Sequence, residues 1–247
     1  MDKTFIFDYD DTLAWNQHDY SYAQIEFLNW IIFEKLWPNA PDLQSIINLE
    51  VEIDNKNVET MSFSMERFPT SFQQTYKSIC EEKNINYNKE DLKEDLKKAY
   101  EIGMLAFDEK RWKKLGLVDG AKETLDFLVE KEDELILLTK GDLKIQEKKI
   151  KATDCQKWFG KEIYIVPQKD AGVIDKIVGN RNPSKVWHVG NSARSDVQHA
   201  LKAGIKMIYI PCETWAYERK HEKVEENPRL ITFQKIIEIK NNYNSLI

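Results

Sequence analysis

The sequence is poor in cysteine, and the three cysteines that it has lie far apart. Cys80, Cys155 and Cys212 include no Cys-x-x-Cys pair in a chain of 247 residues. Disulfide frameworks and structural zinc sites need several cysteines at close or regular spacings, so the sequence predicts neither. Free cysteine is among the most often buried residue types, and we expect these thiols to be buried or inert.

Long apolar runs and an excess of basic charge are also missing. No apolar stretch approaches the roughly 20 residues that span a bilayer, and the strand-like run that starts at Thr4 leaves no room for a signal peptide. The net charge is -6, and lysines alternate with glutamates along the sequence. The sequence therefore predicts no positively charged surface that would attract the phosphate backbone of a nucleic acid. We expect a cytoplasmic protein that binds neither membranes nor nucleic-acid polymers. Its oligomeric state is left open.

Histidine is scarce, and its four copies are scattered along the chain. His188 falls inside a predicted strand, where a hydrogen-bonded core imidazole is the ordinary case. We therefore expect no catalytic histidine. Two tryptophans near predicted site loops, Trp15 and Trp215, are expected to pack against neighbouring segments rather than to bind substrate.

The chain contains five short runs that are rich in Ile, Val, Leu and aromatic residues. They are Thr4 to Asp8, Glu134 to Thr139, Glu162 to Val166, Lys185 to Gly190 and Lys206 to Ile210. Such continuous apolar runs are typical of parallel strands that are buried on both faces. Helix-like segments such as 120–131 and 196–203 alternate with the later strands, which predicts an α/β fold with right-handed crossovers.

An insertion interrupts this alternation after the first strand. About 100 residues precede the helix that leads into the second strand, whereas a whole βαβ unit needs only about 30. Apolar spacings in the insertion are helical, for example at Ile25, Leu28 and Ile32. The sequence therefore predicts a helical domain over residues 16–115, inserted into a core of residues 1–15 and 116–247.

Polar residues follow the first four predicted strands. They are Asp8, Asp10 and Asp11 after the first, Thr139 at the end of the second, Lys169 and Asp170 after the third, and Asn191, Ser192 and Asp196 after the fourth. Parallel strands bring these ends to one edge of the sheet, where ligands bind. Converging carboxylates repel one another unless a cation intervenes, and oxygen ligands suit Mg²⁺.

Each of these residues alone has an ordinary structural explanation. An aspartate after a strand is often a turn residue or a helix N-cap, and Thr139 could simply begin a helix. The succession of a carboxylate pair, a hydroxyl, a lysine and a carboxylate at consecutive strand ends is harder to obtain from turns. We therefore interpret the set as one functional site.

These segments make the chain similar to the haloacid dehalogenase-like (HAD) hydrolase superfamily. The four matching motifs are residues 5–13, residues 135–141, Lys169 within residues 166–170, and residues 188–196. Lys176 is a weaker candidate for the lysine because it lies farther from its strand. The resemblance implies a Rossmann-like parallel sheet with strand order 5-4-1-2-3, and it implies that the helical insertion is a C1 cap over the active site.

The resemblance also implies catalytic roles. Asp8 would be the nucleophile of a phosphatase, and Asp10 would serve as its general acid and base. Thr139 and Lys169 would stabilise the phosphoryl group, and the substrate-binding set would be Thr139, Lys140, Gly141 and Lys169. Closure of a cap would favour a small phosphorylated metabolite, although the sequence does not identify which one.

Mg²⁺ is the cofactor that the resemblance implies. Its expected ligands are Asp8, Asp10 through the backbone carbonyl, Asp196, and Asn191 either directly or through water. Asn191 stands where relatives often have an acid, which concerns metal affinity more than the class of reaction. Asp11 replaces a common glycine and is expected to be a turn residue.

Other functions stay open at this point. A haloacid dehalogenase would need neither the metal nor Asp10, so Asp10 argues against it. A phosphomutase of the same superfamily is compatible with the sequence. A phosphonate hydrolase would need a suitably placed cap lysine, which is not recognisable here, and the intact set of polar residues disfavours a non-catalytic phosphate-binding protein.

Overall fold

The computed structural model describes residues 3–85, 88–212 and 224–246, and the chain divides into two compact units. One unit comprises Met1–Gln17 and Glu109–Ile247, and the other comprises His18–Asp108. The sequence places these boundaries at residues 15/16 and 115/116. Trp215 and His221 lie outside the described residues.

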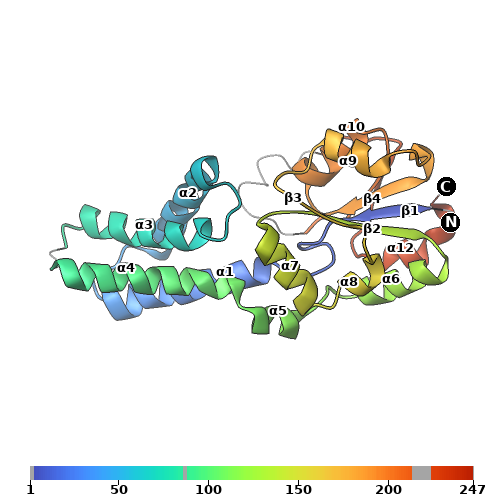
Figure 1. Ribbon diagram of the computed structural model, residues 1–247. Helices are drawn as coiled ribbons and strands as arrows, with labels where there is room; N and C mark the ends of the chain where they lie inside the picture. Colours follow the sequence, from blue (N-terminus) through green and yellow to red (C-terminus); the bar gives the residue numbers. More distant parts are fainter. Residues whose placement is uncertain (1–2, 86–87, 213–223, 247) are drawn as a thin grey trace. The chain divides into compact units, whose positions relative to one another are not determined.

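The larger unit is built on a parallel sheet (Figure 1). Its strands are β1 (Thr4–Phe7), β2 (Glu134–Lys140), β3 (Ile163–Val166), β4 (Val186–Gly190), β5 (Lys206–Tyr209) and β6 (Leu230–Thr232). They lie in the order β3-β2-β1-β4-β5-β6, and every neighbouring pair is parallel. The predicted α/β class and the order of the first five strands are confirmed. The edge strand β6 was not predicted.

Helices cover both faces of this sheet. They are α5 (Glu109–Leu115), α6 (Ala121–Glu130), α7 (Leu143–Ala152), α8 (Gln156–Phe159), α9 (Ala171–Val178), α10 (Gln198–Lys202) and α12 (Glu238–Asn241), with short 3₁₀ or π turns at Pro183–Lys185, Ala193–Val197 and Tyr243–Ser245. Figure 1 shows α9 and α10 on one face and α6 and α12 on the other. Because side chains alternate along a strand, Phe5 and Phe7 join the core beneath α6, whereas Ile6 joins the core beneath α9.

Capping residues begin the helices that follow the central strands. Asp142 accepts a hydrogen bond from the Ile145 amide at the start of α7 (3.2 Å), and Asp170 accepts one from the Val173 amide at the start of α9 (2.8 Å). Such caps satisfy amides that have no partner within the helix. The short, capped connections keep the ends of β2 and β3 next to rigid helices, and this positions the loop residues described below.

Among its described residues, the regular elements of the smaller unit are all helical, as expected. Its elements are α1 (Gln17–Asn29), a π-helical segment (Trp30–Lys35), α2 (Leu43–Met61), α3 (Arg67–Glu82), α4 (Lys89–Gly103) and a 3₁₀ turn (Met104–Phe107). Its core contains stacked rings, with the centroids of Phe27 and Phe72 4.2 Å apart. Gly103 lets α4 approach α3, because a Cβ there would lie 2.6 Å from the Cα of Pro69.

A cluster of three buried charged residues lies inside this helical unit. Glu50 and Asp54 come from α2 and Arg67 from α3, and we call them the helical-unit charge cluster. Arg67 forms an ion pair with Asp54, while Glu50 accepts hydrogen bonds from Gln24 (2.9 Å) and Ser71 (3.2 Å). Burial, with a smaller contribution from Asp54, raises the pKa of Glu50 to about 7.

The structure shows where the three cysteines lie and whether any helix could span a membrane. Cys80 and Cys155 are buried as expected, and burial raises the pKa of Cys155 to about 12, which makes it an unreactive thiol. Cys212 is only partly buried. Among the described residues, no helix has the length and apolar character needed to cross a bilayer.

Candidate active site

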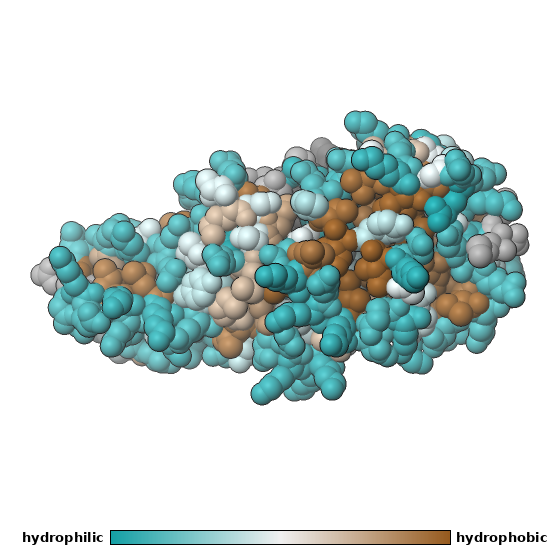
Figure 2. All heavy atoms as spheres, viewed as in Figure 1, coloured by the Kyte–Doolittle hydropathy of each residue, from teal (hydrophilic) through white to brown (hydrophobic). Residues whose placement is uncertain are grey.

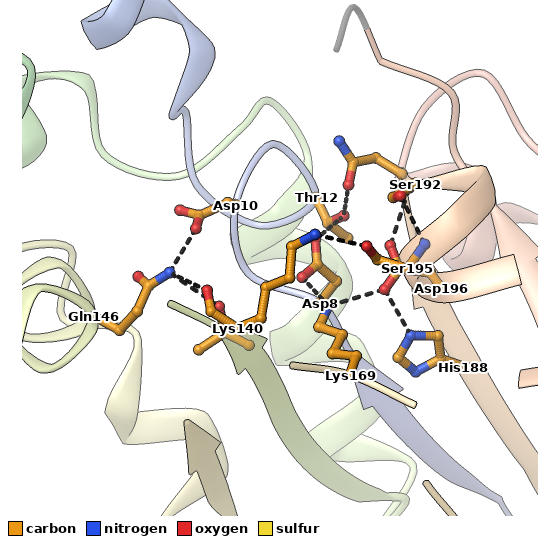
Figure 3. A network of polar contacts seen from close by, with 12 residues as sticks. Asp8, Asp10, Thr12, Lys140, Gln146, Lys169, His188, Ser192, Ser195 and Asp196 are labelled. Atoms are coloured by element: carbon orange, nitrogen blue, oxygen red, sulfur yellow. Dashed lines mark hydrogen bonds and ion pairs between the residues drawn. The ribbon is translucent and has the colours of Figure 1, made fainter. Parts of the chain in front are cut away.

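Three charged side chains from different loops meet at the carboxyl edge of the sheet (Figure 3). Asp8 follows β1, Lys169 follows β3, and Asp196 lies in the turn after β4; we call them the core charge cluster. The Lys169 ammonium forms an ion pair with Asp8 and lies 2.9 Å from the Asp196 carboxylate. All three side chains are almost completely buried. One cation therefore pairs with two carboxylates at this site.

Asp8 is held so that its carboxylate faces this cluster. The Thr12 hydroxyl donates a hydrogen bond to Asp8 Oδ2 (2.9 Å), and Lys169 contacts Oδ1. Burial raises the pKa of Asp8 to about 7; the charge of Lys169 opposes this rise and that of Asp196 adds to it. Additional positive charge beside Asp8 would favour its ionised form, which is the form that a nucleophile needs.

Asp196 receives more donors than Asp8. The Ser192 amide donates to Oδ2 (3.0 Å), while Lys169 and His188 Nε2 both contact Oδ1, the latter at 3.0 Å. Burial would raise the pKa of Asp196, but Lys169 and His188 outweigh it and hold the pKa below its usual range. Gly190 leaves room for this carboxylate, because a Cβ at that position would collide with Asp196.

His188 supports Asp196 from inside β4. The ring is fully buried, and burial lowers its pKa, so the imidazole is neutral and donates from Nε2 to the ionised carboxylate. Among residues 3–85, 88–212 and 224–246, its Nδ1 finds no hydrogen-bond partner. His188 thus acts as a structural donor to Asp196, close to the core imidazole that the sequence predicts.

The residues present fit a hard cation. Asp8 and Asp196 share one ammonium, and the Asn191 amide oxygen lies 3.4 Å from the Thr12 hydroxyl that contacts Asp8. Within the described part of the chain, no three His, Cys, Asp or Glu side chains converge to hold a metal. A cation here would therefore take two carboxylates and complete its shell with neutral oxygens such as amides, carbonyls or water, a donor set suited to Mg²⁺.

Asp10 lies apart from the core charge cluster. Figure 3 shows its carboxylate directed toward Gln146 and away from Asp8. Gln146 donates to Asp10 Oδ2 (2.6 Å), and Lys149 forms an ion pair with Oδ1. The Asp10 side chain keeps 24% of its surface exposed, compared with 8% for Asp8, so Asp10 is the more accessible of the two carboxylates.

The predicted substrate-binding residues also reach this edge of the sheet. Thr139 is buried at the end of β2, and its hydroxyl lies 3.2 Å from Gln146 Nε2. Lys140 extends to Ser195, to whose hydroxyl it donates (2.7 Å). Gly141 has a φ of +143°, a conformation that suits glycine, and its amide bonds to the Val166 carbonyl (3.0 Å).

The structure distinguishes the two candidates for the catalytic lysine, and it shows the role of Asp11. Lys169 contacts both Asp8 and Asp196, whereas Lys176 lies within α9. Asp11 adopts a φ of +57°, and its carboxylate accepts hydrogen bonds from the amides of Asn16 and Gln17, both at 2.9 Å. It is a turn residue, as expected.

Sequence reasoning missed Gln146 and Lys149, the two residues of α7 that contact Asp10. Both are buried although both are polar, and they lie among exposed charged residues that indicate a solvated helix. Their three-residue spacing on one helical face is the signal that could have found them.

Comparison with known proteins identifies the family. The model of the haloacid dehalogenase-like hydrolase family matches residues 45–210, and the chain belongs to this family. The matched range contains Thr139, Lys169, Asn191 and Asp196 but begins after β1. No curated protein sequence matches the chain.

Solved structures share the fold over nearly the whole chain. A haloacid dehalogenase-like family hydrolase from Xanthomonas campestris is 21% identical with a TM-score of 0.69, covering 99% of this chain and 95% of that one. The Bacillus subtilis HAD-hydrolase YfnB, solved bound to magnesium, is 16% identical with a TM-score of 0.58, covering 99% and 98%. A Thermotoga maritima protein named as a β-phosphoglucomutase is 16% identical with a TM-score of 0.60, covering 99% and 100%. Haloacid dehalogenases also match.

Proposed function

We propose that this hydrolase is a Mg²⁺-dependent phosphatase that acts on a small phosphate monoester through an aspartyl-phosphate intermediate. The observation that carries this proposal is the core charge cluster, with a second carboxylate, that of Asp10, two residues beyond Asp8. Asp8 supplies a nucleophile beside a buried cation, and Asp10 supplies a separate, more exposed group for proton transfer.

In the first step, Asp8 attacks phosphorus and the bond from phosphorus to the alcohol oxygen breaks. Asp10 in its protonated form gives its proton to the departing oxygen. Lys169, beside Asp8, and the hydroxyl of Thr139, at the end of β2, are placed to stabilise charge on the phosphoryl group. Lys140 and the Gly141 amide lie at the same loop and would contact the substrate.

In the second step, water attacks the aspartyl-phosphate and the bond from phosphorus to Asp8 breaks. Asp10, now a carboxylate, accepts the proton of the water, so phosphate leaves and both carboxyl groups return to their starting forms. Splitting one hard displacement into two easier ones is the advantage of the covalent route.

Mg²⁺ would be held by Asp8, Asp196, Asn191 and the Asp10 backbone carbonyl, where it would offset the repulsion between the substrate and these carboxylates. The raised pKa of Asp8 and the shared ammonium of Lys169 indicate that this site is short of positive charge. The magnesium bound to YfnB is in line with this proposal.

Two other activities occur among the structural neighbours. A dehalogenase uses its aspartate to attack carbon and has no need of Asp10, so the ordered Asp10 carboxylate favours phosphoryl chemistry. A phosphomutase would return the phosphoryl group to a sugar phosphate, and product analysis separates it from a phosphatase, because only a phosphatase releases inorganic phosphate from every substrate molecule that it consumes.

The deciding experiment is a screen of phosphate monoesters with and without Mg²⁺, using the wild-type protein, Asp8→Asn and Asp10→Asn. We expect Mg²⁺-dependent release of phosphate by the wild type only, with sugar phosphates, nucleotides and other small organic phosphates among the candidates. Full turnover by Asp8→Asn would refute the assignment of the nucleophile. A phosphoprotein as the best substrate would refute the assignment of a small metabolite.

A cytoplasmic location stays a prediction from the sequence.

A further inference from the structure

Helix α7 places two buried polar side chains on the Asp10 carboxylate. Gln146 and Lys149 are separated by one helical turn, and they are 4% and 5% exposed. Neither has a part in the two steps described above. Burying an amide or an ammonium without a partner costs free energy. The groups that Gln146 and Lys149 contact therefore indicate the role of these two side chains.

Lys149 is directed at Asp10 and at the loop that follows it. Its ammonium forms an ion pair with Asp10 Oδ1 and donates to Asn16 Oδ1 (2.6 Å). The Lys149 side chain is only 6% exposed, so few water molecules can replace these partners. An ammonium desolvated to this extent is tolerated because it is paired, and the charged partner is Asp10.

Gln146 joins Asp10 to two of the predicted substrate-binding residues, Thr139 and Lys140. Its Nε2 lies 2.6 Å from Asp10 Oδ2, 3.0 Å from the Lys140 carbonyl and 3.2 Å from the Thr139 hydroxyl. Gly141 leaves room for this amide, because a Cβ there would lie 3.1 Å from Nε2, a tighter contact than usual. One side-chain amide therefore fixes where the Asp10 carboxylate lies relative to the end of β2.

We propose that Gln146 and Lys149 are positioning residues that orient the Asp10 carboxylate to accept the proton of the hydrolytic water. This inference rests on the proposed phosphatase function. Water attacks phosphorus, the bond between phosphorus and Asp8 breaks, and the proton of the water passes to Asp10. A carboxylate oxygen has about two lone-pair sites, and each Asp10 oxygen accepts one of these two donors, so each keeps a site for that proton.

The arrangement suits the second step better than the first. Two donors directed at two oxygens match an unprotonated carboxylate, which is the form of Asp10 that activates water. Departure of an alcohol needs Asp10 as a proton donor, but departure of a very acidic phenol needs no proton at all. With such a phenol as leaving group, loss of Gln146 or Lys149 should slow only the hydrolysis of the intermediate.

The test uses 2,4-dinitrophenyl phosphate and Mg²⁺ in a stopped-flow experiment with the full-length protein. Lys149→Met and Gln146→Met remove the donors at similar side-chain length. We expect each variant to release about one dinitrophenolate per active site in a rapid first turnover at a near wild-type rate. Its steady-state rate should fall about 10-fold to 100-fold, the size of effect expected when a catalytic group is misplaced.

Three controls separate positioning from damage to the fold. Lys148→Met changes an exposed neighbour on α7, whose ammonium pairs with Glu109 (2.8 Å), and it should leave both phases unchanged. Lys149→Arg keeps a cationic donor and should recover more of the steady-state rate than Lys149→Met. Asp10→Asn should show the same separation of phases with a larger loss.

The outcomes are distinct for each proposal. If the first turnover and the steady state slow by the same factor in both variants, or if neither phase changes, the positioning role is wrong. If the wild-type protein releases no phosphate and acid quenching traps no phosphoenzyme, the phosphatase function itself is refuted and this inference is refuted with it.

Discussion

Each of the two units contains a buried cluster of two carboxylates and one cation, and only one of these clusters is a candidate for chemistry. In the core charge cluster, Lys169 contacts both Asp8 and Asp196. In the helical-unit charge cluster, Arg67 pairs with Asp54 while neutral side chains bind Glu50. Burial raises the pKa of Asp8 and of Glu50 to the same value, about 7.

A perturbed pKa therefore does not distinguish the two clusters, but their places in the fold do. The core cluster lies on loops at the carboxyl ends of three parallel strands, where a ligand can enter an open sheet. The other cluster lies between α2 and α3, with Glu50 and Asp54 inside α2 and Arg67 at the first residue of α3. Buried charged residues therefore indicate a catalytic site only when they lie on loops that a ligand can reach and have oxygen atoms free to bind a metal.

The largest expected difference between the clusters is in catalysis. Asp8→Asn removes the nucleophile, and we expect phosphate release to fall at least about 10³-fold. The thermal midpoint should not fall, because the change also removes a buried charge. Steady-state assays and thermal unfolding measure the two effects. The exposed Asp119→Asn is the matched control, and turnover above a tenth of the wild-type rate would contradict the role of Asp8.

Removing the cation of the helical-unit charge cluster should give the opposite pattern. Arg67→Met leaves Asp54 and Glu50 buried without their positive partner, which typically costs about 3–5 kcal/mol in the free energy of unfolding. Denaturant unfolding measures this loss, and Lys77→Met, an exposed change on the same helix, is the control. An unfolding midpoint equal to that of the wild type would show that the cluster contributes nothing to stability.

Metal binding should depend on the core cluster alone. Asp196→Asn removes one of the two carboxylates available to Mg²⁺, and we expect its affinity to fall about 10-fold to 100-fold. Isothermal titration calorimetry with MgCl₂ measures this directly, without an activity assay. Asp175→Asn on the exposed side of α9 should bind as the wild type does, and equal affinities in all three proteins would remove Asp196 from the metal site.

The smallest expected effect is the slope of the free energy of unfolding against pH. The pKa of Glu50 is raised from 4.5 to about 7 in the folded protein, so between these pH values the folded state keeps a proton that the unfolded state has lost. The free energy of unfolding should therefore fall as the pH rises from 4.5 to 7, by at most about 1.4 kcal/mol per pH unit.

Glu50→Gln cannot release this proton, so its free energy of unfolding should depend less steeply on pH in the same range. Denaturant unfolding between pH 5 and pH 8 measures the difference, with the exposed Glu59→Gln as the control on α2. Parallel curves for Glu50→Gln and wild type would show that Glu50 does not titrate with a raised pKa.

Much of the fold and part of the site could be predicted from the sequence. Continuous apolar runs indicated five strands, and parallel pairing then forces Asp8, Lys169 and Asp196 toward one edge, where the structure joins them. The strand β6 was missed because Leu230–Thr232 is too short to give a period. No pattern along the chain shows which polar helical residues are buried.

Gln146 and Lys149 illustrate that limit. The exposed residues Lys144, Glu147 and Lys148 surround them, so the helix reads as a solvated one. Only the packing of α7 beside the ends of β1 and β2 brings the two side chains to Asp10. Glu50 and Asp54 were hidden in the same way, as acids on a long polar helix whose neighbours in space come from other parts of the chain.

The amide of Gln146 has a consequence for how this protein can change by mutation. Because it contacts Asp10, Thr139 and the Lys140 carbonyl together, a substitution at any one of these positions alters the surroundings of the others. Double-mutant cycles among Gln146, Asp10 and Thr139 should therefore be non-additive, whereas cycles between Gln146 and distant surface sites should be additive. Viable variants at these positions should then arise as combinations rather than as independent single steps.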